Sequence, residues 1–118
     1  MSRVEKPWGY ELIWARTPTY VGEILHINAG ESLSLQYHRI KEENIFVYRG
    51  RMLFEHFQEG EPPTQTELGP GGSFHITPGL RHRMTAIEDC EIFEVSTPHL
   101  DDVVRLEDRY GRSGTSTP

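Results

Sequence analysis

The sequence predicts an all-β domain, a barrel or a sandwich of short strands, on three observations. Apolar runs of five to nine residues recur along the chain, turn residues separate them, and helical periodicity is missing before the C-terminal part. Short strands at regular spacing with Gly- and Pro-rich turns are typical of all-β domains. The 118 residues suit one domain, which we place at 1–112, followed by a flexible polar tail at 113–118.

The strand at 32–38 has the cleanest pattern. Apolar and polar residues alternate there, which places Gln36 and His38 together on its polar face. The segment 58–66 is polar and rich in Pro and Gly, and we expect it to form the tip of a loop or hairpin. The segment 100–106 predicts one short helix, which begins near Asp101 or Asp102. The other expected strands are 20–28, 43–48, 51–57, 73–77, 83–87 and 90–96.

Composition excludes several classes of function. The formal net charge is −6 and Lys and Arg do not cluster, which argues against nucleic acid or an anionic membrane as partner. Neither an apolar stretch of about 18 residues nor a leader-like apolar segment is present in the sequence. The single cysteine, Cys90, cannot form an internal disulfide, and we expect a reduced, cytoplasmic protein.

Four polar side chains could meet at one point of such a barrel. Gln36 and His38 lie two residues apart on a strand and point to the same side. Glu43 opens the next strand and can fold back to meet them, and His82 follows a Pro-Gly turn. Two imidazoles, a carboxylate and an amide oxygen suit a divalent transition metal. The alternative is that each histidine is a surface or hydrogen-bonded residue.

Two spaced motifs carry a resemblance to the cupin superfamily. The first motif is a Gly, a ligand, a His, a Glu and a Gly, and the second is a Gly, a Pro, a Gly and a His. The spacings of both are kept here by Gly30, Gln36, His38, Glu43 and Gly50, and by Gly71, Thr77, Gly79 and His82. Gln36 stands where most cupins have a His. Thr77 replaces the usual Pro, and Pro78 follows it.

A closer resemblance is to the C-terminal cupin domain of type II mannose-6-phosphate isomerases. The segments 6–11 (KPWGYE), 30–38 (GESLSLQYH) and 101–112 (DDVVRLEDRYGR) are similar to that branch, and the glutamine at position 36 is itself one of its marks. The chain departs from the branch after His38, where further histidines and a His-Trp pair are replaced by residues such as Lys41 and Asn44.

The resemblance implies a jelly-roll β-barrel with one divalent metal ion (Zn, Mn, Fe, Co or Ni) held by Gln36, His38, Glu43 and His82. It implies an aldose–ketose isomerase acting on a sugar or sugar phosphate. The general base would be Glu43, or Glu23 if Glu43 is a tight ligand. Glu23 could equally lie in solvent at the rim. Lys6 and Arg105 are the candidate phosphate-binding cations, and their alternative is plain surface charge.

Other functions remain open, because the cupin fold hosts several chemistries. A metal-dependent oxygenase would need Fe or Cu. A non-catalytic module that binds a sugar or a nucleotide-sugar is the third possibility. We expect a small-molecule carbohydrate as substrate, and a homodimer that pairs through an edge strand, with the N-terminal arm 4–14 crossing to the other subunit.

Overall fold

The computed structural model describes residues 1–111 and 114–115, and it consists of two six-stranded antiparallel sheets. One sheet has the order β1-β2-β3-β10-β5-β8, and the other has the order β12-β11-β4-β9-β6-β7. The strands are β1 (Ser2–Lys6), β2 (Gly9–Arg16), β3 (Val21–Ile27), β4 (Leu35–Tyr37), β5 (Glu43–Arg49), β6 (Met52–Phe57), β7 (Thr64–Leu68), β8 (Ser73–Ile76), β9 (Arg81–Ala86), β10 (Cys90–Ser96), β11 (Val104–Glu107) and β12 (Gly114–Thr115).

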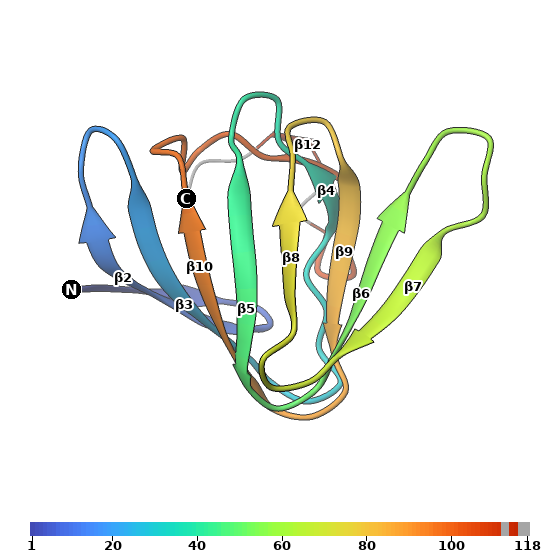
Figure 1. The fold of residues 1–118 in the computed structure, drawn as a ribbon, viewed down its shortest axis with the longest axis horizontal. Coiled ribbons are helices and arrows are strands. Elements are labelled where there is room, and N and C mark those ends of the chain that lie inside the picture. The colour runs from blue at the N-terminus through green and yellow to red at the C-terminus, as the bar shows by residue number, and fades with distance from the viewer. Residues whose placement is uncertain (112–113, 116–118) are drawn as a thin grey trace.

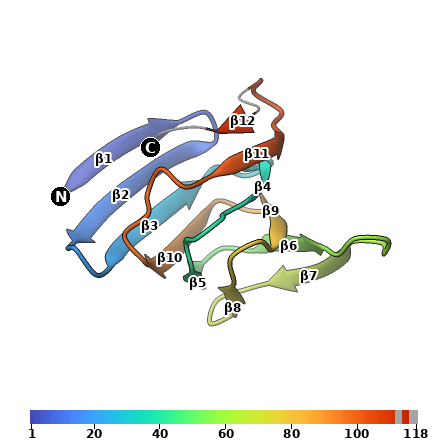
Figure 2. The same cartoon turned by 90° about the horizontal axis from the view of Figure 1, so that it is seen from above.

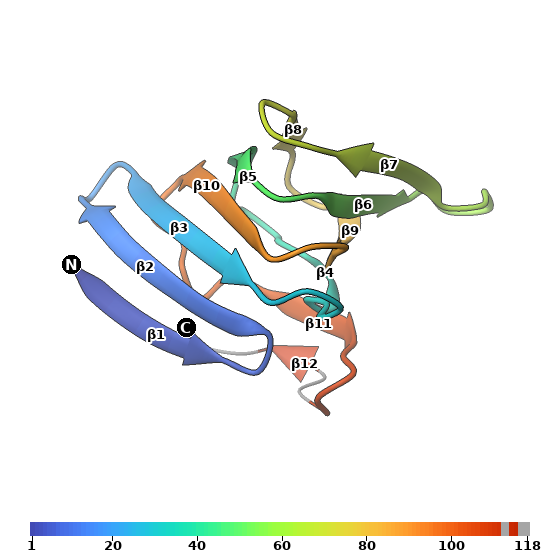
Figure 3. The same ribbon diagram turned by 90° about the horizontal axis from the view of Figure 1, so that it is seen from below.

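The two sheets face each other and enclose the core, as a jelly-roll barrel does. In Figure 1, β5 and β8 lie in front of β4 and β9, and Figure 2 shows the same two layers from above. The N-terminal hairpin of β1 and β2 lies at one side of the molecule, and the hairpin of β6 and β7 lies at the other (Figure 3).

The core forms because every second residue of the central strands points inward. Along most of β5 and β10 buried residues alternate with more exposed ones, so that Ile45, Val47, Cys90 and Ile92 are buried between the sheets. Phe54 of β6 is the largest fully buried side chain. The alternation in β3, β5 and β10 also points three acidic side chains, Glu23, Glu43 and Glu94, toward the interior.

Six of the seven expected strands are found with bounds that differ by at most two residues at either end, and the all-β class is confirmed. The seventh, at 32–38, is shorter: only Leu35–Tyr37 is strand, and Ser32 forms an isolated bridge to Thr85. The loop expected at 58–66 is shortened because β7 begins at Thr64.

The prediction of a short C-terminal helix at 100–106 is wrong. Leu100 and Asp101 form a turn, and β11 (Val104–Glu107) follows, paired with β4 through Val104 and Tyr37. The β-branched Val103 and Val104 favour an extended backbone, and β4 offers an edge to pair with. Tertiary pairing therefore overrides a weak helical pattern.

The N-terminal hairpin of β1 and β2 was not among the expected strands. β2 pairs with β3 of the same chain, and Trp8 in the hairpin turn is buried in the core. The expected boundary at residue 112 and most of the tail 113–118 lie outside the described residues. The described part of the tail, Gly114–Thr115, forms β12 and pairs with β11. Within the described part, no helix has the length and hydropathy that crossing a membrane requires.

Candidate metal centre

The candidate site lies at the end of the barrel where two loops meet. The β4–β5 loop and the β8–β9 turn run side by side at the upper end in Figure 1, and the N–H of Gly79 donates to the carbonyl of His38 at 2.7 Å. His38 directly follows β4, Glu43 opens β5 and His82 lies in β9. The loops thus bring together residues that are up to 44 positions apart, from 38 to 82.

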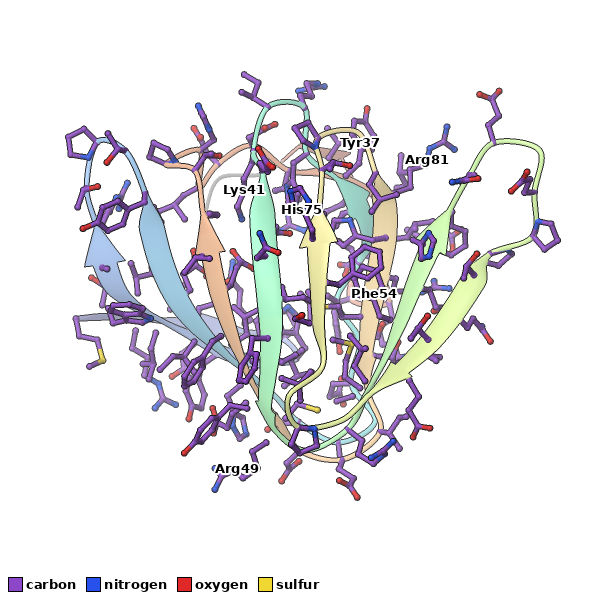
Figure 4. All side chains as sticks on the ribbon, viewed as in Figure 1. Tyr37, Lys41, Arg49, Phe54, His75 and Arg81 are labelled. Carbon is purple, nitrogen blue, oxygen red and sulfur yellow. The ribbon has the colours of Figure 1, made fainter. Side chains whose placement is uncertain are left out.

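Three of the four expected ligands converge closely. One ligand atom from each of His38, Glu43 and His82 can be chosen so that all lie within 4.8 Å of one another. Oε1 of Glu43 lies 3.2 Å from Nε2 of His38 and 3.7 Å from Nε2 of His82. All three side chains are buried. Figure 4 shows the loops and strand ends from which they come.

Both imidazoles are oriented from behind by main-chain carbonyls. Nδ1 of His38 donates to the carbonyl of Asp102 at 2.6 Å, and Nδ1 of His82 donates to the carbonyl of Leu80 at 2.9 Å. A ring that carries its proton on Nδ1 presents the lone pair of Nε2, which is how histidine ligands are held ready for a metal. Burial lowers the pKa of His82, which favours this neutral form at pH 7.

A second observation, the lack of partners for buried polar atoms, also indicates that His38, Glu43 and His82 fit a cation. Nε2 of His82 is buried and makes no hydrogen bond to any of the described residues. In a neutral His38, Nε2 and Oε1 of Glu43 are two acceptors facing each other at 3.2 Å. Buried polar atoms are normally paired, so these atoms lack a positive partner that a divalent ion would supply.

Gln36 lies on the same wall as His82, since the two residues are directly opposite in the β4–β9 pair. Its Oε1 accepts a hydrogen bond from the hydroxyl of Ser34 at 2.7 Å. An amide oxygen has two lone pairs, so this bond leaves one for a further partner. Gln36 as a fourth ligand stays a prediction.

A cavity that His38 and Glu43 line also contains the other expected site residues. Glu23, Lys6 and Arg105 all line it, and Glu23 is only 3 % exposed, so it points inward rather than into solvent at the rim. The space that water molecules can reach inside it is about 70 Å³, room for several of them. Its other lining residues are Trp8, Glu11, Leu25, Leu33, Gln36, His38, Lys41, Glu43, Met84, Glu94, Leu100 and Val103.

Lys41 is the central cation of this cavity. Its Nζ lies 3.1 Å from Oε2 of Glu43 and 3.1 Å from Oε2 of Glu94, and all three side chains are buried. Figure 4 shows Lys41 and Arg49 near opposite ends of β5, with Lys41 at the end that carries the candidate site. Burial alone would lower the pKa of Lys41, but the neighbouring carboxylates outweigh it and raise the pKa.

The three buried carboxyl groups near Lys41 differ in the direction in which their pKa is shifted. Burial opposes ionisation of Glu43, but the charge of Lys41 holds its pKa well below the ordinary value. Burial and the charge of Glu43 raise the pKa of Glu94 well above that value. Burial, followed by the charge of Glu11, raises the pKa of Glu23 to about 7. One ammonium therefore keeps one carboxylate ionised, and the other two hold protons more readily.

Sequence reasoning missed Lys41 and Glu94. Glu94 had a detectable pattern, because it shares the inward face of β10 with Cys90 and Ile92 and lies directly opposite Glu23 of β3. A charge on the apolar face of a strand marks a buried ionic group. Lys41 had no such pattern, since its burial depends on how the β4–β5 loop closes over the barrel.

Comparison of the sequence alone finds no matching protein-family model and no matching curated protein. Solved structures match in fold. KdgF from a Halomonas species has a TM-score of 0.70 and 21 % identity, over 83 % of this chain and 88 % of that one. CapF, the capsular polysaccharide assembling protein of Staphylococcus aureus, has a TM-score of 0.75 and 15 % identity, over 90 % of this chain and 31 % of that one.

Two further structures extend the comparison. A Lactobacillus farciminis oxalate decarboxylase in complex with formate has a TM-score of 0.73 and 18 % identity, over 89 % of this chain and 33 % of that one. A cupin superfamily protein from Desulfitobacterium hafniense has a TM-score of 0.64 and 10 % identity, over 74 % of each chain. The chain thus spans about a third of CapF and of the decarboxylase.

These identities bear on fold alone, and the narrower likeness to mannose-6-phosphate isomerases stays a prediction. Two facing antiparallel sheets, a barrel end closed by two loops and the match to these structures agree with one another. The chain has the jelly-roll β-barrel fold of the cupins.

Proposed function

We propose that the chain is a metal-dependent enzyme acting on a carbohydrate, as an aldose–ketose isomerase of a sugar or sugar phosphate. Gln36, His38, Glu43 and His82 would hold one divalent ion, with Zn, Mn, Fe, Co and Ni as candidates. The observation that carries the proposal is the convergence of His38, Glu43 and His82 beside a cavity that also holds Glu23, a carboxyl with a pKa of about 7.

The residues divide the work of such a reaction between them. A bound divalent ion polarises a carbonyl group and orients the oxygens of the sugar. Glu23 takes the proton from the carbon next to the carbonyl and returns it to the former carbonyl carbon, while the hydroxyl proton passes to the former carbonyl oxygen. A base with a pKa near the working pH suits this transfer. Glu43 is the weaker candidate base, because Lys41 lowers its pKa well below the ordinary value and because it would itself be a ligand of the ion.

Lys6 of β1 and Arg105 of β11 line the cavity from the two opposite sheets, and they would bind a phosphate or hydroxyl groups there. Lys6 lies 4.0 Å from Oε1 of Glu11, so a phosphate would compete with that carboxylate. The fold likeness to CapF, a protein of capsular polysaccharide assembly, supports a carbohydrate as the substrate class. Both phosphorylated and free sugars therefore belong in the test.

The test begins with elemental analysis of protein purified without added metal. The metal-free protein is then loaded with each candidate ion and incubated in D₂O with mannose 6-phosphate, mannose and other aldoses, and NMR follows isomerisation and deuterium uptake at carbon. We expect one ion per chain, turnover only with the ion, loss of ion and turnover in His38→Ala, and loss of turnover with the ion retained in Glu23→Gln. His75→Ala is the matched control, since His75 pairs with Glu42 on the exposed surface.

Other outcomes identify the competing functions. Bound Fe or Cu with oxygen uptake would replace the isomerase by an oxygenase. An ion bound in stoichiometric amount, together with saturable sugar binding and no turnover, would identify a binding module. Absence of any ion after loading would overturn the metal site itself.

A further inference from the structure

An apolar patch covers the outer face of the sheet that contains β2, β3, β10 and β5. Register places Leu12, Ile24, Phe93 and Phe46 side by side in one row across these four strands. All four point away from the core, because their neighbours in each strand point inward. We call the outer patch the set Leu12, Trp14, Tyr20, Ile24, Phe46, Tyr48, Phe93 and Val95.

The aromatic rings of the outer patch pack against one another and form a continuous surface. Tyr48 stacks on Phe93 with ring centroids 5.0 Å apart, and Phe46 lies 6.4 Å from the same ring. Trp14 covers Gly22, where an added Cβ would lie 2.6 Å from the indole. The missing side chain lets the indole lie close to the sheet. Tyr20 and Val95 line one shallow groove beside it.

The patch is comparable in area to the largest apolar patch that a typical single chain exposes, and such patches are often functional. Five aromatic residues, Trp14, Tyr20, Phe46, Tyr48 and Phe93, are between 38 % and 60 % exposed. With about 150–250 Å² for each aromatic residue, they leave on the order of 500 Å² in water. Patches of this size commonly mark interaction sites. A standard interface takes about 800 Å² from each partner, which the patch and its rim would supply.

The rim at one end of the patch carries charges that are already paired within the chain. Oε1 of Glu91 lies 2.9 Å from Nδ1 of His26 and 3.2 Å from a terminal guanidinium nitrogen of Arg49. The chain has a formal net charge of −6, so a second copy would be repelled by unpaired acidic groups on a contact face. A row of apolar groups beside a neutralised rim avoids that repulsion.

We propose that the outer patch is the interface of a homodimer, in which the two sheets pack face to face about a two-fold axis. A twisted sheet packs best on another sheet of the same twist, and a second copy supplies that shape without further adaptation. The apolar centre and polar rim have the layout of a dimer interface. β2 pairs with β3 of its own chain, so in this dimer the arm 4–14 contributes Leu12 and Trp14 to the sheet face and does not cross to the partner as a strand.

The test measures the mass of the protein in solution by sedimentation over a wide concentration range. We expect twice the 13.6 kDa of one chain for the wild type. Phe93→Glu and Tyr48→Glu should each raise the dimer dissociation constant by more than about thirtyfold, because each places a charge in the apolar centre. Ile40→Glu is the matched control, since Ile40 is 63 % exposed on a loop outside the patch.

Tryptophan fluorescence gives a second readout that does not need the variants. Trp8 is buried in the core, whereas Trp14 is 54 % exposed, so acrylamide quenching reports mainly on Trp14. Quenching should increase as the wild type is diluted below its dissociation constant. A wild type of single-chain mass at every concentration would overturn the proposal. A dimer that persists in both Glu variants, or one in which Trp14 remains open to acrylamide, would overturn it equally.

Discussion

The ammonium of Lys41 lies 3.1 Å from Oε2 of Glu43, while Oε1 of the same carboxylate lies 3.2 Å from Nε2 of His38. The two oxygens of Glu43 are thus divided between a fixed cation and the imidazoles. A carboxylate held in this way would offer a metal ion one oxygen rather than two. Together with two imidazoles, that arrangement leaves coordination positions open for a substrate.

Removing the ammonium should be costly. We expect Lys41→Met to lower the free energy of unfolding of the metal-free protein by about 3–5 kcal/mol, because the ionised carboxylate of Glu43 loses its buried counter-charge. The double variant Lys41→Met/Glu43→Gln should recover part of this loss, since the unpaired buried charge is then removed. Urea unfolding measures both. The control is Lys6→Met, whose nearest carboxylate oxygen is 4.0 Å away, and an equal loss in the two single variants would contradict the central role of Lys41.

Glu23 makes stability depend on pH. Its pKa is raised from 4.5 to about 7 in the folded chain, so the folded state holds the proton more tightly than the unfolded state does. This carboxyl leaves stability unchanged below pH 4.5, lowers it as pH rises from 4.5 to about 7, where the unfolded chain gives up the proton first, and adds no further change at higher pH. Glu23→Gln should therefore stabilise the metal-free protein by up to about 3 kcal/mol at pH 8 and leave it unchanged at pH 4.

Thermal unfolding at these two pH values checks the Glu23 prediction. Glu59→Gln, in the exposed loop between β6 and β7, is the control and should show the wild-type dependence on pH. A Glu23→Gln variant that is destabilised at pH 8 would show that the ionised carboxylate makes a favourable contact in the fold.

Asp102 holds the loop that carries Lys41. Its carboxylate accepts the N–H groups of Arg39, Ile40 and Lys41 at 3.1, 2.6 and 2.8 Å, and its carbonyl accepts from His38. Asp102→Ala should lower the free energy of unfolding by about 1–3 kcal/mol and weaken ion binding by about 10–100-fold. Calorimetry with Co²⁺ or Mn²⁺ measures the second effect, and the exposed neighbour variant Asp101→Ala should change neither quantity.

The contribution of Asp102 should disappear in acid. The N–H groups outweigh its partial burial and lower the pKa of the carboxyl from 3.8. The stabilisation is therefore present above pH 3.8 and is lost as pH falls through the lowered pKa. Wild type and Asp102→Ala should then converge in stability, and a constant difference down to the lowest accessible pH would contradict this origin.

Gly50 should resist replacement for two separable reasons. Its φ is +88°, and an added Cβ would lie 2.1 Å from the carbonyl oxygen of Asp89. Gly60 has a φ of +78°, but nothing lies within 4 Å of its Cβ position. Gly60→Ala should cost about 1 kcal/mol from backbone strain alone, and Gly50→Ala clearly more. Chemical unfolding compares them, and equal losses would show that the turn relaxes away from Asp89.

Much of the fold was open to prediction because alternation along single strands determines which face is buried. The bounds of β10 were predicted correctly, since Cys90–Ser96 alternates throughout and turns bound it. β7 was missed because all but the last of its residues are exposed, so that no apolar face marks it. Pairing with β4 decides the state of Val104, and the local sequence does not contain that information.

The candidate site divides in the same way. Gln36 and His38 share one face of the expected strand, Glu43 opens the next strand in the sequence and His82 follows a Pro-Gly turn, so all four could be grouped from the sequence, and the cupin motifs then matched them. The ion pairs of Lys41 and the carbonyl of Asp102 depend on loops that meet only in the folded chain. The sequence pattern thus predicts site residues that lie on regular strands, but it does not predict the residues that loops bring into contact with them.

The hydrogen bond from His38 to the carbonyl of Asp102 joins positions that are 64 residues apart. During translation, His38, Glu43 and His82 would all leave the ribosome before the group that sets the tautomer of the first of them. A metal ion would therefore bind to the completed fold rather than to the growing chain. The identity of the bound metal would then depend on the ions available where folding is completed, as much as on the preference of the ligands themselves.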